Sequence, residues 1–208
     1  MKKPSIEQID NFFPRDIAEF VAQYAGDAAY TYGERDNSPE DVLDVRDPTG
    51  LVHELYNLEH PDLFNRDIGK KGSPEDAKLV YECFIKGIGN KYPGFLDEYK
   101  VYRLYVNCFA PRELAYFHQD CYEDADQYTF LYYPLHPLFE YDIVEGGCTE
   151  FYVDRKVIGT PPFPNSIVRF KSQLLHRATP FRSHHRFAYA IKFACNAEVD
   201  EFVNGKHG

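Results

Sequence analysis

The second half of the chain is divided into short runs of β-branched and aromatic residues, and this pattern constrains the fold more than any other feature. The runs are Val101–Phe109, Tyr128–Tyr133, Thr149–Val153, Ile167–Phe170 and Arg186–Phe193. Turn residues separate them, and each run has the length and composition of a β-strand. Several short strands at this spacing are typical of a sandwich or a barrel. The seventeen Tyr and seventeen Phe suit a small β core filled with aromatic rings.

The first half carries helical signals. After an extended entry over Ile6–Phe13, apolar residues recur at helical spacing from Ile17 to Tyr24. Ser73-Pro74-Glu75-Asp76 has the cap, the proline and the acids of a helix start, and Gly87 marks the expected end. The apolar face of this second helix is predicted to carry Leu79, Val80, Cys83 and Phe84.

Length and composition fit a single globular domain. The 208 residues are 44% hydrophobic and 27% charged. We expect one domain over 1–208, with a helical support and lid region over 1–99, a β-stranded core over 100–197 and a tail over 198–208. No apolar run approaches the roughly 20 residues that span a bilayer, and no signal peptide follows Lys2 and Lys3, so no membrane partner is expected. Five cysteines without a Cys-x-x-Cys pair predict reduced thiols and a cytoplasmic protein.

The charge is unevenly distributed. A net charge of −10 argues against a nucleic-acid partner, because phosphate backbones favour clustered Lys and Arg. Residues 155–197 nevertheless contain eight basic and no acidic residues, so the remainder carries a net charge of −18. This basic segment predicts either a solvated face or a pocket for a small anion.

One set of residues has the composition of a metal site. His118-Gln119-Asp120 follows a strand-like run, and His176 ends another. Two imidazoles and one carboxylate form the facial triad that holds non-haem Fe(II). Side chains 118 and 120 point the same way on an extended chain, so both can reach one metal. A His-x-Asp pattern alone is weak evidence, and an isolated His118 would be read as a structural histidine.

Residues 100–195 resemble the 2-oxoglutarate- and Fe(II)-dependent dioxygenases, in particular their prolyl-4-hydroxylase-like branch. The resemblance rests on pieces that occur in the family's order: His118-Gln119-Asp120, the strand Tyr128–Tyr133, Gly146–Phe151, Asn165–Phe170, His176–Pro180 and Arg186. The entry Ile9–Pro14 with its helix is also similar to the family's N-terminal opening.

The resemblance implies a mainly β fold with packed helices: a double-stranded β-helix (jelly-roll) core with N-terminal helical support. It also implies iron held by His118, Asp120 and His176, with Arg186 binding the distal carboxylate of 2-oxoglutarate. Fe(II), 2-oxoglutarate and O₂ are therefore the expected cofactor and cosubstrates. A guanidinium suits this role because it can hydrogen-bond a carboxylate with two donors. Strand alternation puts Arg186, Ala188 and Ala190 on one face and the aromatic residues of the same run on the other.

Further site residues follow from the resemblance. Tyr133 is the candidate hydroxyl for the cosubstrate carboxylate, and Thr129 shares its strand face. A hydroxyl from elsewhere is needed because Ala188 stands where other branches have serine. Tyr105 and Asn107 are candidates to line the substrate pocket, with a purely structural role as the alternative. His136 is a candidate substrate contact, with a surface histidine as the alternative.

The implied activity is hydroxylation of a small-molecule or peptidyl substrate, with succinate and CO₂ as products. The retained carboxylate of Asp120 favours hydroxylation, since relatives that halogenate replace it with a small residue. Peptidyl-prolyl 4-hydroxylation is one alternative, and a non-catalytic jelly-roll that binds metal or ligand is another. The sequence leaves the oligomeric state open.

Overall fold

The computed structural model describes residues 6–28, 30–35, 49–58, 74–113, 115–135 and 146–205. Its helices are α1 (Arg15–Asp27), α2 (Pro74–Lys91), α3 (Phe95–Glu98) and α4 (Asn196–Gly205). Its strands are β1 (Glu7–Ile9), β2 (Thr31–Arg35), β3 (Thr49–Asn57), β4 (Tyr99–Phe109), β5 (Gln127–Tyr133), β6 (Thr149–Val153), β7 (Lys156–Thr160), β8 (Ser166–Lys171), β9 (His176–Ala178) and β10 (Arg186–Cys195).

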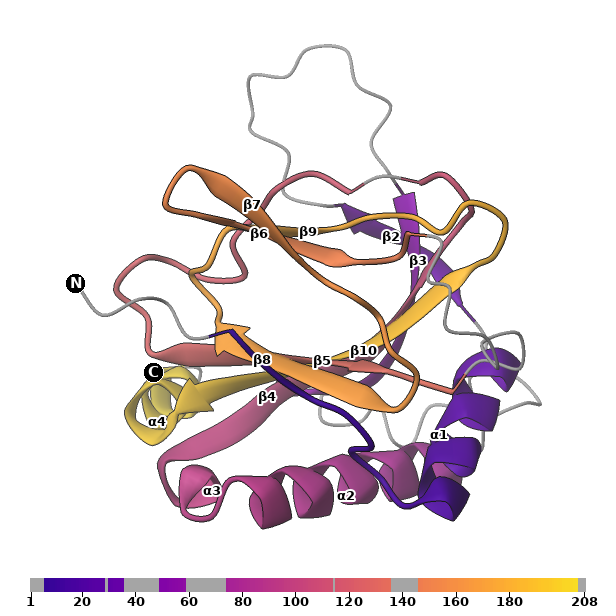
Figure 1. Cartoon of the computed structure of the whole chain (residues 1–208). Helices are drawn as coiled ribbons and strands as arrows, with labels where there is room; N and C mark the ends of the chain where they lie inside the picture. The colour runs from indigo at the N-terminus through magenta and orange to yellow at the C-terminus, as the bar shows by residue number, and fades with distance from the viewer. Residues whose placement is uncertain are drawn as a thin grey trace.

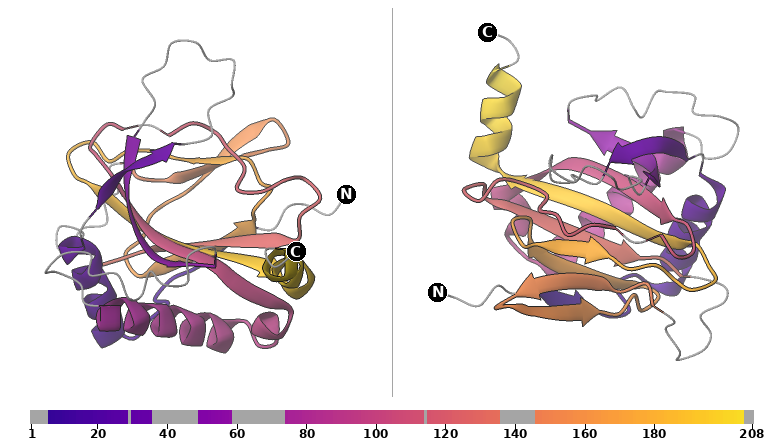
Figure 2. Two further views of the ribbon diagram at one scale, coloured as in Figure 1. Left: turned by 180° about the vertical axis from the view of Figure 1, so that it is seen from behind. Right: turned by 90° about the horizontal axis from the view of Figure 1, so that it is seen from above.

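The strands form two antiparallel sheets that face each other. The large sheet has the order β1-β8-β5-β10-β4-β3-β2, and the small sheet has the order β7-β6-β9. In Figure 1, α1 and α2 lie below the large sheet, on the face that points away from the small sheet. Figure 2 shows the same layers from behind and from above, with α4 extending beyond the end of β10. This architecture confirms the predicted fold class of a mainly β jelly-roll with packed helices.

The outer face of the large sheet is joined to the helices by aromatic packing. Phe84 of α2 is fully buried, and its ring centroid lies 5.3 Å from that of Tyr132 and 5.1 Å from that of Tyr189. The hydroxyl of Tyr189 donates to the carbonyl of Val21 in α1 at 2.8 Å. Gly87 permits this close approach, since a Cβ there would lie 2.8 Å from the ring of Phe13. The helices therefore support the large sheet from its outer face.

The inner face of β10 points toward the small sheet. Arg186, Ala188, Ala190 and Lys192 line a cavity there, while Tyr189, Ile191 and Phe193 belong to the helix-facing core. The predicted alternation along this strand is thus confirmed. Small alanines between two long cationic side chains leave open space in the middle of the strand.

The five predicted strands are present, and each end lies within two residues of the predicted position. The structure adds β2, β3, β7 and β9, and β1 lies within the predicted extended entry over Ile6–Phe13. β2 and β3 come from the first 99 residues, where only helical support and a lid region were expected, and β3 pairs with β4. The predicted tail begins within α4, which starts at Asn196.

The second helix differs from its prediction in length and in its buried face. α2 continues past Gly87 to Lys91. Its fully buried residues are Val80, Phe84 and Ile88, whereas Leu79 is 49% exposed. These three buried residues recur every four positions and form the face of α2 that packs against the sheet. Leu79 lies one position outside this face. Among the described helices, none is long and apolar enough to cross a membrane.

Candidate metal centre and the cavity around it

The two histidines of the predicted triad are held together by the backbone. The N–H of His118 donates to the carbonyl of His176 at 2.9 Å, and the N–H of His176 donates back to the carbonyl of His118 at 2.9 Å. Their ring centroids lie 4.5 Å apart. This bridge fixes both Cα positions, so the backbone holds the two histidines side by side.

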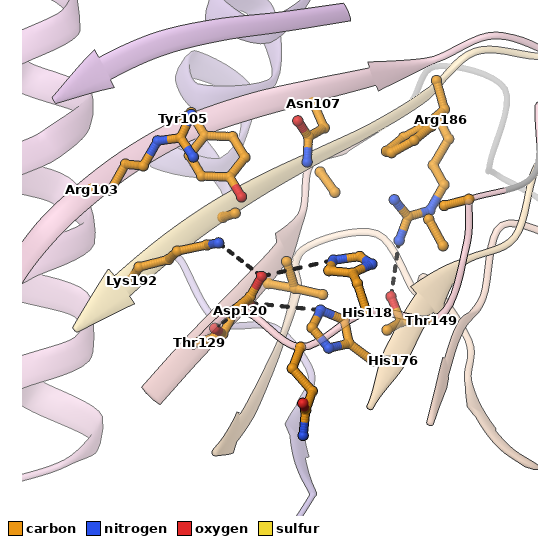
Figure 3. A pocket seen from close by; sticks show the side chains of 17 residues that line it. Arg103, Tyr105, Asn107, His118, Asp120, Thr129, Thr149, His176, Arg186 and Lys192 are labelled. Carbon is orange, nitrogen blue, oxygen red and sulfur yellow. Dashed lines mark hydrogen bonds and ion pairs between the residues drawn. The ribbon is translucent and has the colours of Figure 1, made fainter. Parts of the chain in front are cut away.

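Asp120 completes the cluster. Its backbone N–H donates to the carbonyl of Ser172 at 2.9 Å. Its Oδ1 lies 3.8 Å from Nε2 of His118, and its Oδ2 lies 3.7 Å from Nε2 of His176. One potential ligand atom from each residue lies within 4.8 Å of the others, and Figure 3 shows the three side chains converging. The structure therefore brings the three predicted ligands together.

Both imidazoles present Nε2 to this cluster. Nδ1 of His118 lies 3.0 Å from the carbonyl of Tyr116, and Nδ1 of His176 lies 2.8 Å from the carbonyl of Leu174. A carbonyl only accepts, so Nδ1 carries the hydrogen and Nε2 keeps its lone pair for a metal. Burial lowers the pKa of His176 to about 4, so this ring is neutral at physiological pH. The donor set therefore fits a divalent transition metal.

The carboxylate of Asp120 is held from both sides. The hydroxyl of Thr129 donates to Oδ2 at 2.6 Å, and the ammonium of Lys192 donates to Oδ1 at 2.8 Å. Burial alone would raise the pKa of Asp120, but Lys192 and the two histidines outweigh it and bring this pKa below its ordinary value. The ligand is therefore ionised before a metal arrives.

Arg186 is buried in the same cavity, at 3% exposure. Its Nε donates to the carbonyl of Gly147 at 2.8 Å, and its Nη2 donates to the hydroxyl oxygen of Thr149 at 2.9 Å. Within the described ranges no carboxylate pairs with it. Burial lowers the pKa of Arg186, yet a guanidinium remains charged at physiological pH. A buried cation without a carboxylate partner has the donors and the charge that suit an anion.

Thr149 is a site residue that the sequence reasoning missed. It supplies the hydroxyl beside Arg186 that Ala188 cannot, and the hydroxyl of Tyr133 lies 2.6 Å from its Oγ1. Its position at the start of a predicted strand, directly after Gly146-Gly147-Cys148, was the available signal. Gly147 has φ +72°, and a Cβ there would lie 2.3 Å from the ring of Phe181, so glycine is needed where the carbonyl turns toward Arg186.

The structure separates the two predicted cosubstrate contacts. Thr129 contacts the metal-ligand carboxylate instead of Arg186. Tyr133 lies at the Arg186 end of the cavity, with its hydroxyl 2.6 Å from Oγ1 of Thr149 and its ring 5.4 Å from the guanidinium carbon. Tyr105 and Asn107 both line the cavity. His136 lies outside the described residues.

The cavity has a volume of about 290 Å³ and two cationic ends. In Figure 3, Arg186 and Thr149 lie at one end, Lys192, Arg103 and Tyr105 lie at the other, and the triad lies between them. Of the eight basic residues in segment 155–197, only Arg186 and Lys192 line this cavity among the described residues. Others pair elsewhere, as Arg177 does with Glu150 at 2.8 Å, so the basic segment does not form one continuous anion pocket.

Lys192 and Arg103 are further cavity residues that the sequence reasoning did not place. Lys192 shares the strand face of Arg186, Ala188 and Ala190, so the period of two was a usable signal. Arg103 offered none, because its relation to Lys192 comes from the register of β4 with β10.

No family model matches the chain, and no curated protein matches its sequence. Solved structures do match. A prolyl-4-hydroxylase from Pseudomonas putida is 14% identical with a TM-score of 0.59, covering 93% of this chain and 94% of that one. A prolyl hydroxylase from Trichoplax adhaerens, in complex with a peptide fragment of hypoxia inducible factor, is 18% identical with a TM-score of 0.63, covering 93% and 84%.

A third similar structure is HygX from Streptomyces hygroscopicus, with nickel and 2-oxoglutarate bound. It is 10% identical with a TM-score of 0.61, covering 93% of this chain and 84% of that one. At such identities the likeness is one of fold. The chain therefore has the double-stranded β-helix fold of the 2-oxoglutarate/Fe(II) oxygenases, in the form shared with the prolyl hydroxylases.

Proposed function

We propose that the protein is a 2-oxoglutarate- and O₂-dependent Fe(II) hydroxylase of a small-molecule or peptidyl substrate, with succinate and CO₂ as products. One observation carries this proposal: a His-Asp-His cluster and a buried arginine without a carboxylate partner line the same cavity. Neither feature alone specifies the reaction. Together they match the two requirements of the cosubstrate, which must chelate a metal at one end and neutralise a cation at the other.

The triad would hold the metal from one side. His118, Asp120 and His176 provide three ligands and leave the remaining coordination positions open to the cavity. Bound Fe(II) would supply the O₂ chemistry that couples decarboxylation of 2-oxoglutarate to hydroxylation of the substrate. Thr129 and Lys192 orient the Asp120 carboxylate and keep it ionised, so the ligand needs little rearrangement when the metal binds.

The arginine end would hold the cosubstrate. The carbonyl of Gly147 fixes Nε of Arg186, and Thr149 receives one Nη2 hydrogen bond, so the guanidinium is oriented before a ligand binds. A distal carboxylate can then accept hydrogen bonds from this guanidinium. Ala188 and Ala190 leave room for the carbon chain between Arg186 and the metal.

Two alternatives differ in substrate or in turnover. Peptidyl-prolyl 4-hydroxylation is supported by the prolyl hydroxylases among the similar structures, one of which binds a peptide. A jelly-roll that binds metal without turnover would be favoured by a missing ligand or a missing arginine. All three ligands and Arg186 are present.

The test needs no substrate. Metal-free protein is prepared without oxygen, Fe(II) is added, and 2-oxoglutarate is titrated while visible absorption is recorded. We expect a weak metal-to-ligand charge-transfer band that saturates with 2-oxoglutarate and is missing in His176→Ala. The matched control is His185→Ala, an exposed histidine that does not line this cavity. Folded, iron-loaded protein without the band would refute the proposal and favour a binding-only jelly-roll.

A further inference from the structure

Lys192 is a buried cation with unused hydrogen-bonding capacity. It is 8% exposed and donates to Oδ1 of Asp120 at 2.8 Å. An ammonium has three donors, and in the described part of the chain Lys192 has no other hydrogen-bond partner. The ion pair with Asp120 uses one of these donors, so two donors of the ammonium are available to a further acceptor in the cavity.

Lys192 lies in a row of side chains that crosses three strands. In the sheet register it is opposite Thr129 of β5 on one side and Arg103 of β4 on the other. Its Nζ lies 5.5 Å from the ring centroid of Tyr105, and the guanidinium carbon of Arg103 lies 4.3 Å from the same centroid. Two cations and an aromatic ring therefore form this wall, on the far side of the triad from Arg186 (Figure 3).

A count of charges shows what this wall lacks. Among the described residues, Arg103, Arg186, Lys192 and Asp120 are the charged side chains that line the cavity, and Arg103 is paired with Glu54 at 2.8 Å. The remaining three side chains carry one net positive charge. A divalent metal and dianionic 2-oxoglutarate cancel each other, so the positive charge stays, and Arg186 is then occupied. Asp120 is then shared between the metal and Lys192, so the remaining positive charge lies at the Lys192 end of the cavity.

We propose that the Lys192 end of the cavity is the subsite of the substrate and binds a carboxylate or phosphate group of a small molecule. This inference rests on the proposed function, because that function assigns the metal and Arg186 to other ligands. The free donors of Lys192 hydrogen-bond the anion, and Arg103 adds positive potential. A cavity of about 290 Å³ suits a small molecule, whereas a peptidyl proline carries no charge of its own.

Small anions test the subsite without knowledge of the substrate. The anaerobic complex with Fe(II) and 2-oxoglutarate is titrated with acetate and, separately, with methyl phosphate, at constant ionic strength. Acetamide and methanol are the neutral controls. We expect at least one anion to shift the position of the charge-transfer band with saturation while its intensity is kept, because 2-oxoglutarate is not displaced. The arm that responds identifies a carboxylate or a phosphate site.

Variants assign the effect to Lys192. Lys192→Met should weaken anion binding by about tenfold to hundredfold, the usual loss for a charge-assisted hydrogen bond, and Lys192→Arg should restore most of it. Lys100→Met removes an exposed lysine that pairs with Asp200, and it should bind the anion like the unmodified protein.

Two results would overturn the proposal: no response to either anion, or equal anion binding by Lys192→Met. Anion affinity is measured in parallel from the thermal unfolding of the metal-loaded protein. If the unmodified protein shows no band, the proposed function is refuted. Thermal unfolding still compares anion binding by the unmodified protein with that by Lys192→Met.

Discussion

The backbones of His118 and His176, the first residue of β9, exchange two hydrogen bonds of 2.9 Å each in an antiparallel bridge. Their Nε2 atoms face the carboxylate of Asp120 because each Nδ1 is tied to a carbonyl two residues earlier. The main chain thus positions both imidazoles, and either side chain can be removed without breaking the backbone bridge.

Removing any of the three ligands should abolish turnover. We expect His118→Ala, Asp120→Ala or His176→Ala to eliminate 2-oxoglutarate-dependent formation of succinate, since two remaining ligands cannot hold the metal in place. Succinate is measured after incubation with Fe(II), and circular dichroism checks that each variant is folded. Substantial succinate formation by a folded variant would remove that residue from the ligand set.

Arg186→Ala should strongly raise the concentration of 2-oxoglutarate that the protein requires. The variant loses the buried guanidinium that would pair with the distal carboxylate, and a charged hydrogen-bonding partner contributes a factor of about ten to a hundred in affinity. The midpoint of the charge-transfer titration gives this value directly. An unchanged midpoint would exclude Arg186 from the cosubstrate site.

Thr149→Val tests the hydroxyl that orients Arg186. Valine has nearly the same shape but cannot accept the 2.9 Å hydrogen bond from Nη2 or meet the hydroxyl of Tyr133. We expect the 2-oxoglutarate midpoint to rise about fivefold to tenfold, with the affinity for Fe(II) unchanged. Thr160→Val is the control, because that threonine hydroxyl donates to the carbonyl of Thr149 and has no contact with Arg186. Equal midpoints in both variants would contradict this role.

The metal-free protein should lose stability as the pH falls from about 7 toward 4. The pKa of His176 is about 4 in the folded state, against the ordinary 6.5 of an exposed imidazole in the unfolded chain. The unfolded chain therefore binds more protons within this pH window. Stability from the neutral ring is present above pH 6.5 and is lost on acidification, by about 2 kcal/mol between pH 7 and pH 5. Urea unfolding at several pH values measures it, and His176→Ala should flatten the profile. A profile equally steep in that variant would assign the pH dependence to other groups.

Phe84→Ala should destabilise the fold without altering the site. The ring is fully buried against Tyr132 and Tyr189, and deleting such a side chain costs about 3–5 kcal/mol. Leu79→Ala, on the same helix but 49% exposed, should cost less than about 1 kcal/mol. Denaturant unfolding compares the two variants. Similar losses would mean that the buried face of α2 is wrongly assigned.

Much of the fold could be read from local sequence patterns. A strand alternates its side chains with a period of two, so the run from Arg186 onward already separated the cavity face from the aromatic face. β2 and β3 could not be predicted from such a pattern. In β3, buried His53 and Leu55 stand beside Glu54 and Asn57, and this mixed composition lacks the apolar run of the other strands.

The sequence by itself identified His118, Asp120 and His176 as candidate metal ligands by residue type and spacing, and Arg186 as their candidate partner through the family resemblance. Only the tertiary structure decided which residues support them. Thr129 and Arg103 lie on either side of Lys192, and Thr149 lies beside Arg186, through register and sheet-to-sheet packing between segments far apart in the chain. Register is a property of two strands together, and a shift by one residue would turn each of these side chains to the opposite face.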